Sequence, residues 1–345
     1  MTDTSASAGE AAVRATIARA TIADVARASG VSTTTVSHVL TGKRPVAAAT
    51  RDRVQAAVVE LHYRPNHVAR NLRVGSSQMI AVVVPDITNP FYAQLTRGLA
   101  DALGSDYGTW VCNTDGSAGR ERQYVSDVLA RGADGLVVAS VERDSARASA
   151  PTRFDIPVVC LGESIDHPLV DRVIAADSEA SRSAVEHLVA RGARRVAMIS
   201  GPVTHGQSRV AGYHEALDEA GLRVSRQLNV HGDWTRAGGR GAMHRLMRTP
   251  HPPDAVFCAN DLMAIGALDA ARELDLRLPE DVRLVGFDDI EAASLVSPAL
   301  TTIANPAYET GWSAGKLVLD RLQGRHSGSR RTVVLPCRLI VRETS

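Results

Sequence analysis

The sequence predicts an α/β protein in which a small helical head precedes two similar lobes, each built on a doubly wound parallel sheet. From Met79 onward, short apolar runs alternate with helical patterns, the order expected for parallel strands joined by crossover helices. The order strand, polar loop, helix at 80–103 returns at 196–220, which predicts a repeated lobe. Residues 21–61 hold helical patterns only.

The first two predicted helices are joined by a tight turn at Gly30. Ile22, Val25 and Ala26 repeat at helical spacing and give the first helix an apolar side. Glycine accepts the left-handed conformation that ends a helix, and Ser32 is placed to cap the next one. The segment therefore predicts a helix-turn-helix.

In the second helix we expect Val36 and Leu40 to face the core. Four polar side chains share the opposite face: Thr33, Thr34, Ser37 and His38. Such a helix fits the major groove of DNA, where hydroxyl groups bond base edges or phosphates. The alternative is a small helical hairpin with a solvated polar face, and this pattern alone does not exclude it.

A third amphipathic helix is predicted over 50–61, with Val54, Val58 and Leu61 turned inward to complete a shared core. Pro65 then breaks the helical pattern, and a second short helical pattern begins after it. This segment has the character of a hinge rather than of a core element.

From Thr21 onward the chain resembles the LacI/GalR (lactose-repressor) family of bacterial transcription regulators. Residues 21–40 meet the pattern T-I-x-D-V-A-x-x-x-G-V-S-x-x-T-V-S-x-V-L. Further matching segments are Pro45-Val46, Thr50-Arg51, 63–66, 69–72, 84–92, 185–188, 199–202, 209–213, 259–261, 285–289 and 300–302. The resemblance covers about 21–343 and implies a two-lobed core like that of type I periplasmic binding proteins.

The resemblance implies DNA-binding roles for seven residues: Thr21, Thr33, Thr34, Ser37, His38, Asn66 and Leu72. Among them the two threonines of the second helix and His38 take the base-reading positions. Leu72 matches a leucine that wedges between base pairs from the minor groove, exchanging unstacking cost for extra wrapped surface.

Three positions depart from the family pattern. His38 stands where many relatives have arginine, Thr41 where asparagine is usual, and Ala47 where a serine usually caps the third helix. The missing cap should cost about 1 kcal/mol. A neutral imidazole cannot make the two-pronged contact with guanine that arginine makes, so the operator sequence of relatives does not transfer.

Length and composition limit the number of domains and the class of protein. A chain of 345 residues is long enough for two or three domains, and its net charge of +1 hides an asymmetry. Residues 1–75 carry ten Lys/Arg and five Asp/Glu, so +5, which leaves 29 minus 33, or −4, for the rest. A basic head suits a phosphate backbone, although chance clustering on a solvated face gives the same excess.

The four cysteines, Cys112, Cys160, Cys258 and Cys337, lie in or beside apolar runs and are expected to be buried thiols in a reducing compartment. No Cys/His spacing predicts a metal, and we expect no cofactor. Residues 1–20 lack the apolar region of a signal peptide, and no run reaches membrane-spanning length. We therefore expect a soluble, cytoplasmic protein.

The predicted domains are a disordered extension over 1–20, a DNA-binding head over 21–65, a hinge helix with linker over 66–76 and a core over 77–345. The core is divided into lobe 1, about 77–175 and 305–330, and lobe 2, about 176–304 and 331–345. The strands predicted for it are 80–84, 109–112, 135–139, 157–160, 196–199, 255–258, 284–287 and 333–341. The chain then crosses between lobes near Ala175, Asn305 and Arg330, and a helix over 306–322 packs on lobe 1.

Ligands of such sheets bind beyond the carboxyl ends of the strands, so the residues just after each strand are the candidates. They offer aromatic faces, a guanidinium fork and carboxylates, a set suited to gripping a polyhydroxylated ring. The resemblance implies effector contacts by Phe91, Tyr92, Arg209, Trp234 and Asp261. Asp261 is alternatively a helix cap, and the first two aromatics are alternatively core residues.

The leading hypothesis is a dimeric repressor that binds a palindromic operator and is controlled by a small molecule, a sugar or sugar derivative, between its lobes. Relatives that form tetramers carry an extra C-terminal helix. The sequence shows no such helix after Glu343, so we expect a dimer. A sugar-binding receptor is the alternative, but it needs an export signal and has no use for a basic head. An enzyme is disfavoured because no Walker loop, GxSxG elbow or GxGxxG after a strand is found, and 238–241 lacks the spacing.

Overall fold

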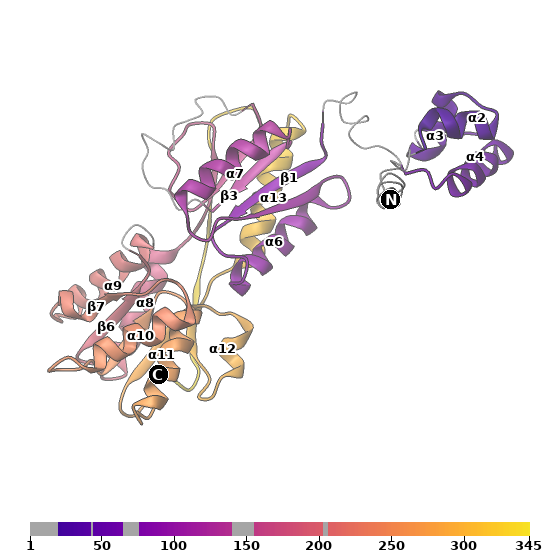
Figure 1. Ribbon diagram of the computed structural model, residues 1–345. Coiled ribbons are helices and arrows are strands. Elements are labelled where there is room, and N and C mark those ends of the chain that lie inside the picture. Colours follow the sequence, from indigo (N-terminus) through magenta and orange to yellow (C-terminus); the bar gives the residue numbers. More distant parts are fainter. Residues whose placement is uncertain (1–19, 43, 65–75, 140–154, 203–205) are drawn as a thin grey trace, which may run out of the picture. The chain divides into compact units, whose positions relative to one another are not determined.

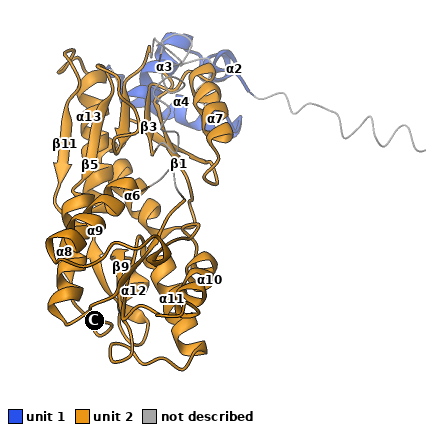
Figure 2. Ribbon diagram, turned by 90° about the vertical axis from the view of Figure 1, so that its left-hand side faces the viewer, with its two compact units in different colours: residues 1–75 blue, residues 76–345 orange. Residues whose placement is uncertain are grey.

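The computed structural model describes residues 20–42, 44–64, 76–139, 155–202 and 206–345. The chain divides into two compact units, residues 1–75 and 76–345, and each is described by itself (Figure 2). The predicted hinge, with Asn66 and Leu72, lies outside the described residues.

The first unit holds three helices: α2 (Ile22–Ser29), α3 (Thr33–Thr41) and α4 (Ala48–Glu60). Gly30 ends α2 in the left-handed conformation, with φ 67°, and the Ser32 hydroxyl caps α3 by accepting a hydrogen bond from the Thr35 amide. Ala47 gives α4 no side-chain cap, as the sequence predicts. The turn between α2 and α3 is therefore short and fixed at both ends.

Val25, Val36 and Val54 are fully buried where the three helices meet. The prediction that Leu40 faces this core is wrong, since its side chain is 36% exposed and Val39 packs against the core instead. Residues three apart on a helix share a face, so Val36 and Val39 turn inward together, and Leu40 lies further round.

The second unit holds two six-stranded sheets, one in each lobe (Figure 1). The lobe-1 sheet has the order β11-β5-β4-β3-β1-β2, and all its neighbouring strands run parallel. Its strands are β1 (Met79–Val84), β2 (Gly108–Asn113), β3 (Gly135–Val138), β4 (Val158–Leu161), β5 (Asp171–Ala175) and β11 (Thr332–Leu335).

The lobe-2 sheet has the order β12-β10-β9-β8-β6-β7, in which only β12 runs antiparallel to its neighbour among the described pairs. Its strands are β6 (Val196–Ser200), β7 (Asn229–His231), β8 (Ala255–Cys258), β9 (Arg283–Asp288), β10 (Thr301–Ala304) and β12 (Arg338–Ile340). The two sheets are thus built on the same plan, as the repeat in the sequence predicts.

Helices cover both faces of the lobe-1 sheet. On one face, α6 (Pro90–Leu103) and α13 (Ala307–Leu322) pack against the side chains of Ile80, Val82 and Val84. The alternate residues of β1 point to the opposite face, which is covered by α7 (Ala118–Ala130). A strand buried on both faces explains why β1 is apolar throughout.

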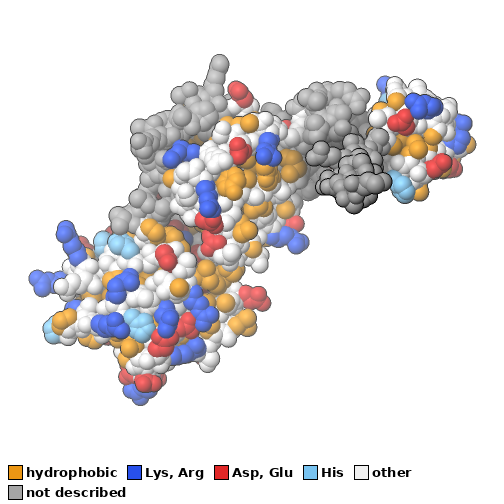
Figure 3. Space-filling view, viewed as in Figure 1, with side chains coloured by type: hydrophobic (Ala, Val, Ile, Leu, Met, Phe, Trp, Pro, Cys, Tyr) orange, Lys and Arg blue, Asp and Glu red, His pale blue; other side chains and the backbone are white. Residues whose placement is uncertain are grey.

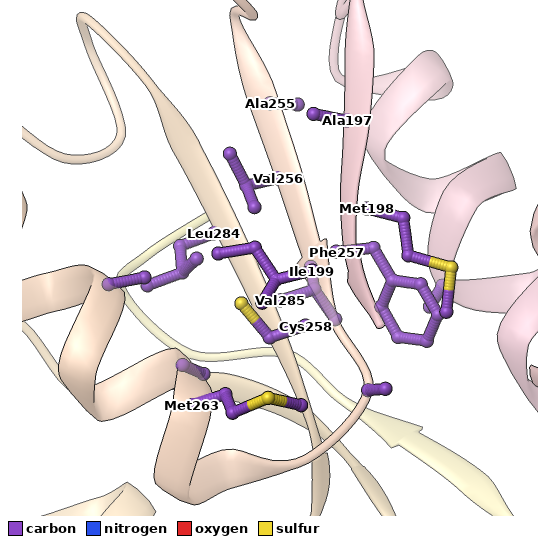
Figure 4. Packing of buried hydrophobic residues seen from close by; sticks show 14 of the residues in the cluster. Ala197, Met198, Ile199, Ala255, Val256, Phe257, Cys258, Met263, Leu284 and Val285 are labelled. Carbon is purple, nitrogen blue, oxygen red and sulfur yellow. The ribbon is translucent and has the colours of Figure 1, made fainter. Parts of the chain in front are cut away.

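In lobe 2, α8 (Asp177–Ala190) pairs with α9 (Gln207–Glu219), and α10 (Arg236–Met247) pairs with α11 (Asp261–Glu273). A short helix, α12 (Glu291–Leu295), follows β9. Figure 4 shows side chains of β6, β8 and β9, among them Met198 and Phe257, close to one another in the buried cluster of this lobe.

Three connections join the lobes. They follow β5, β10 and β11, the last at Pro336-Cys337. The predicted third crossing near Arg330 therefore lies too early, and the strand predicted over 333–341 is two strands on different sheets. Proline donates no backbone hydrogen bond, so a strand pairing ends naturally where Pro336 stands.

Candidate functional site

The residues proposed to read DNA lie on α3, whose Val36 is buried in the core of the first unit. Thr33 and Thr34 are exposed there, and Ser37 and His38 are half-buried. This placement gives the first unit a polar helix face beside a buried apolar one, as the sequence predicts.

Thr21 stands at the exposed N-terminus of α2. Its hydroxyl lies 2.7 Å from Asp24 Oδ2, and the Asp24 amide donates back to it at 3.3 Å. The hydrogen bonds from Thr21, followed by the charge of Arg27, hold the pKa of Asp24 below its usual value. Thr21 therefore fixes the start of the helix that precedes α3.

The proposed effector site centres on Arg209, in the first turn of α9. Its Nε donates to Asp177 Oδ2 at 3.0 Å, and its Nη1 lies 3.7 Å from Asp288 Oδ1. The guanidinium carbon lies 3.6 Å from the centre of the Phe287 ring, and Nη1 also donates to the Ala259 carbonyl. Asn305 Nδ2 donates to Asp288 at 3.1 Å. We call Asp177, Arg209, Phe287, Asp288 and Asn305 the Arg209 cluster.

Burial and charge set the protonation of this cluster. Burial raises the pKa of Asp288 to about 6, against the lowering effect of Arg209 and the Asn305 hydrogen bond. Burial alone would lower the pKa of Arg209, but Asp177 and Asp288 outweigh it and raise that pKa. Arg209 therefore stays charged, while the Asp288 carboxyl titrates close to neutral pH.

Two acceptor atoms of the Arg209 cluster have no hydrogen-bond donor among the described residues. They are Asp177 Oδ1 and Asn305 Oδ1, and both are buried. A buried acceptor without a donor is costly unless another molecule supplies one. The cluster therefore has unused capacity to accept hydrogen bonds.

Trp234 comes from the turn before α10, where it takes the left-handed conformation with φ 70°. Asn260 Nδ2 donates to its carbonyl at 3.0 Å. Its ring covers the end of β6 so closely that a Cβ on Gly201 would come within 2.0 Å of it. The ring is thus fixed on the loop that leads to Arg209.

Asp261 lies behind this site. It is fully buried, and its carboxylate accepts hydrogen bonds from the Thr302 hydroxyl at 2.5 Å and the Ile290 amide at 2.9 Å. Burial, and then the charge of Asp288, raises the pKa of Asp261 well above its usual value. The cap of α11 is Asn260, not Asp261. Both carboxylate oxygens of Asp261 are therefore used inside lobe 2.

Phe91 and Tyr92 begin α6 in lobe 1, after Asn89 as the helix cap. Their rings meet edge to face, with centroids 5.2 Å apart, and both pack against the lobe-1 core. Burial raises the pKa of Tyr92, and so do the nearby charges of Asp288, Asp86 and Asp177. Because Asp288 and Asp177 belong to lobe 2, charges of the Arg209 cluster act on a side chain of lobe 1.

Sequence reasoning did not single out four members of the Arg209 cluster. Phe287 and Asp288 belong to a segment that matches the family pattern, and Asp288 ends β9. The rule that ligand-binding residues follow parallel strands points to Asp288 as well. Asp177 and Asn305 carried no such signal, because each follows a strand, β5 or β10, that the sequence did not predict.

Comparison with known proteins identifies the family. A model described as "Bacterial regulatory proteins, lacI family" matches residues 21–66, and one described as "Periplasmic binding protein-like domain" matches 185–345. The HTH-type transcriptional repressor CytR of Escherichia coli (strain K12) is 35% identical over 327 residues, covering 94% of this chain and 95% of that protein. The chain belongs to the LacI family of bacterial regulatory proteins. That family membership confirms the resemblance seen in the sequence.

Solved structures of LacI-family proteins agree with this fold. A lac repressor dimer bound to operator and the anti-inducer ONPF is 30% identical, with a TM-score of 0.82 over 94% of this chain and 99% of that one. A complex of the transcriptional regulator CelR with cellobiose is 32% identical, with a TM-score of 0.71 over 95% of this chain and 100% of that one.

Two features typical of other classes of protein are absent from the described residues. No helix described here is long and apolar enough to cross a membrane. Within the same residues, no group of three or more His, Cys, Asp or Glu side chains is arranged to hold a metal ion.

Proposed function

We propose that this LacI-family protein is a transcriptional repressor that binds a palindromic operator as a dimer and responds to a neutral, hydroxyl-rich small molecule. The observation that carries the proposal is a helix-turn-helix with a polar α3 face in the same chain as a two-lobed core. The relatives named above are repressors or regulators, which supports the same role.

The charges around the Arg209 cluster favour a neutral effector. The pKa of Tyr92 responds to one guanidinium, that of Arg209, and to three carboxylates, those of Asp86, Asp177 and Asp288. Arg209 is already paired with two of them. A phosphate or carboxylate would meet this excess of negative charge, whereas hydroxyl groups donate to it. Sugars and nucleosides satisfy this requirement, and the CelR complex holds a sugar, cellobiose.

The DNA half of the proposal is tested by selecting duplexes from a random pool with the purified full-length chain. We expect enrichment of a palindromic sequence, bound more tightly than a scrambled duplex of the same length at the same salt concentration. Equal affinity for every duplex would contradict sequence-specific binding.

The effector half is tested by thermal shift with matched pairs: ribose against ribose 5-phosphate, and cytidine against cytidine 5′-monophosphate. A ligand that binds the folded chain stabilises it in proportion to its affinity. We expect any stabilisation to come from the neutral member and to be lost in Arg209→Ala. Stabilisation by only the phosphorylated member would contradict the neutral class.

A sugar-binding receptor remains the alternative from another class, because its core has the same two-lobed plan. The DNA selection separates the two, since a receptor has no reason to enrich one sequence. LacI-family relatives are non-enzymatic regulators, and turnover of a bound sugar by the purified chain would point to a different class altogether.

A further inference from the structure

The two units of the chain separate between Gly75 and Ser76. Immediately after that boundary, the segment Ser76–Met79 wraps around the carboxylate of Asp134, the residue before β3. β1 and β3 are neighbouring parallel strands of lobe 1, so this contact lies at the end of the sheet where both strands begin (Figure 1). We call these residues the Asp134 anchor.

Four donors from the segment reach the carboxylate. The hydroxyls of Ser76 and Ser77 each lie 3.0 Å from Oδ2, the Ser77 amide lies 3.2 Å from Oδ1 and the Met79 amide 3.3 Å from Oδ2. The serine hydroxyls also accept from the amides of Gln78 and Met79. An ionised carboxylate has acceptor sites for all four donors, and charge strengthens each bond.

The backbone is bent to make these contacts. Gln78 takes the left-handed conformation, with φ 55°, which costs energy for a residue other than glycine, asparagine or aspartate. The bend turns the amides of Ser77 and Met79 to the same carboxylate. Such a conformation persists only when its surroundings stabilise it. The Asp134 carboxylate does so by binding the residues on either side of Gln78, and the Gly108 amide by donating to the Gln78 carbonyl at 2.8 Å.

The anchor is not needed to hold β1 in its sheet. β1 pairs with β2 on one side and β3 on the other, and its residues 80–84 are fully buried. The carboxylate binds Ser76 and Ser77, which precede the strand, and the amide of the first strand residue, Met79. Its loss therefore loosens 76–77, while the Gln78 carbonyl still accepts from the Gly108 amide and β1 stays paired on both sides.

We infer that Asp134 is a positioning residue for DNA binding: it fixes the point at which the DNA-binding unit leaves the core. The inference rests on the proposed function, because it requires the first unit to bind DNA. With the anchor in place, the segment that leads to the head starts at the end of the lobe-1 sheet where β1 and β3 begin. A change in the orientation of that lobe then moves the departure point with it.

Length alone would make a small difference. Loosening 76–77 adds two residues, about 7 Å of reach, to the chain that joins the units. Even if effective concentration falls as the −3/2 power of a link that grows from eleven to thirteen residues, the change is about 1.3-fold per head, or less than about twofold for two heads. A larger effect on operator binding therefore reports the loss of a fixed departure point.

The test compares the full-length chain with Asp134→Asn, in which an amide NH2 replaces one acceptor. Asp106→Asn is the matched control, because Asp106 is exposed on the surface of the same lobe. We expect faster hydrogen exchange in peptides covering 76–84 and operator affinity reduced more than fivefold in Asp134→Asn. In Asp134→Asn, binding to a scrambled duplex and the thermal unfolding of the core should stay close to those of the wild type. The Asp106→Asn control should change neither the hydrogen exchange of 76–84 nor the operator affinity.

Ser77→Ala gives a second, milder variant that removes one donor. We expect a partial loss of operator affinity from it, and no further loss when it is combined with Asp134→Asn. Unchanged hydrogen exchange over 76–79 in Asp134→Asn, or operator affinity within twofold of the wild type, would overturn this inference and leave the proposed function standing. A wild-type chain that binds no selected duplex would defeat the proposed function first, before any variant is made.

Discussion

At the scale of single residues, Asp288 connects the effector site to the pH of the solution. It ends β9 in a left-handed conformation, with φ 112°, and lies almost fully buried between Arg209 and Asn305. Burial disfavours its ionised form more than Arg209 favours it, so its pKa is raised to about 6 from an ordinary value of 3.8. The folded chain therefore keeps a proton there that the unfolded chain has already lost.

The sign of the resulting pH dependence follows from that difference. A raised carboxyl pKa gives a stabilisation that is present below about pH 4 and lost as the pH rises through about 6, amounting to about 3 kcal/mol. Asp288→Asn removes this titration. We expect the free energy of unfolding of the core, measured by urea titration, to fall more between pH 4.5 and pH 7.5 in the wild type than in Asp288→Asn.

Asp218→Asn is the control for this prediction, because Asp218 is exposed on α9. Its unfolding free energy should follow the wild-type pH profile. Parallel profiles for the wild type and Asp288→Asn would mean that Asp288 is ionised in the fold across this range.

At the scale of helices and strands, glycines set how closely the helices pair. A Cβ on Gly311 of α13 would lie 1.8 Å from the Leu95 carbonyl of α6, and one on Gly98 would lie 2.0 Å from the Tyr308 carbonyl. In lobe 2, Gly266 of α11 meets the Arg236 carbonyl of α10 at 1.9 Å in the same way. These pairs pack backbone against backbone, which no larger residue allows.

Gly311→Ala should therefore force α13 away from α6. We expect a loss of about 1–3 kcal/mol or more in the unfolding free energy of the core, measured by urea titration. Gly241→Ala on α10 is the matched control, since the nearest group to its Cβ is the flexible Arg245 side chain at 3.7 Å. There the better helix propensity of alanine should add up to about 1 kcal/mol. Equal effects of the two substitutions would contradict close packing.

Ion pairs join α10 and α11 on the outside of the same lobe. Arg236 pairs with Asp269, and Arg240 and His244 both meet Glu273. Figure 3 shows charged side chains of both signs over these helices. The arginines of these pairs are more than half exposed, so the pairs contribute little, and the glycine contacts decide the spacing of the helices.

Some strands could be predicted from the sequence and others could not. β1, β6 and β8 were predictable because they are continuous apolar runs buried on both faces. β5 and β10 escaped prediction because polar residues are buried in them: Asp171 is paired with two arginines in β5, and Thr302 in β10 donates to Asp261. Such partners come from distant parts of the chain, so no local pattern reports them.

The same limit applies to the candidate site. Arg209 and Trp234 were predictable from strand ends and family pattern. The positions of Asp177 and Asn305 beside Arg209 depend instead on where the chain crosses between lobes. These crossings are a property of the whole second unit rather than of any local segment.

At the scale of the whole molecule, the basic head bears on how the proposed dimer binds DNA. With an excess of +5 charges in residues 1–75, one head alone attracts any phosphate backbone. Specificity then depends on both heads binding together, because the second head binds at the effective concentration that its link to the first provides. A two-fold dimer requires a palindromic site for this to occur.

A full palindromic operator should therefore bind at least about 100-fold more tightly than the same duplex with one half scrambled, because the second head adds its affinity as an intramolecular step. Fluorescence anisotropy at one fixed salt concentration measures both dissociation constants. Raising the salt should weaken both duplexes, since each loses phosphate contacts, and the full site should lose more because two heads release counterions there. Equal affinity for the full and half sites, with equal salt dependence, would mean that one head binds at a time and that the chain does not act as a dimer on DNA.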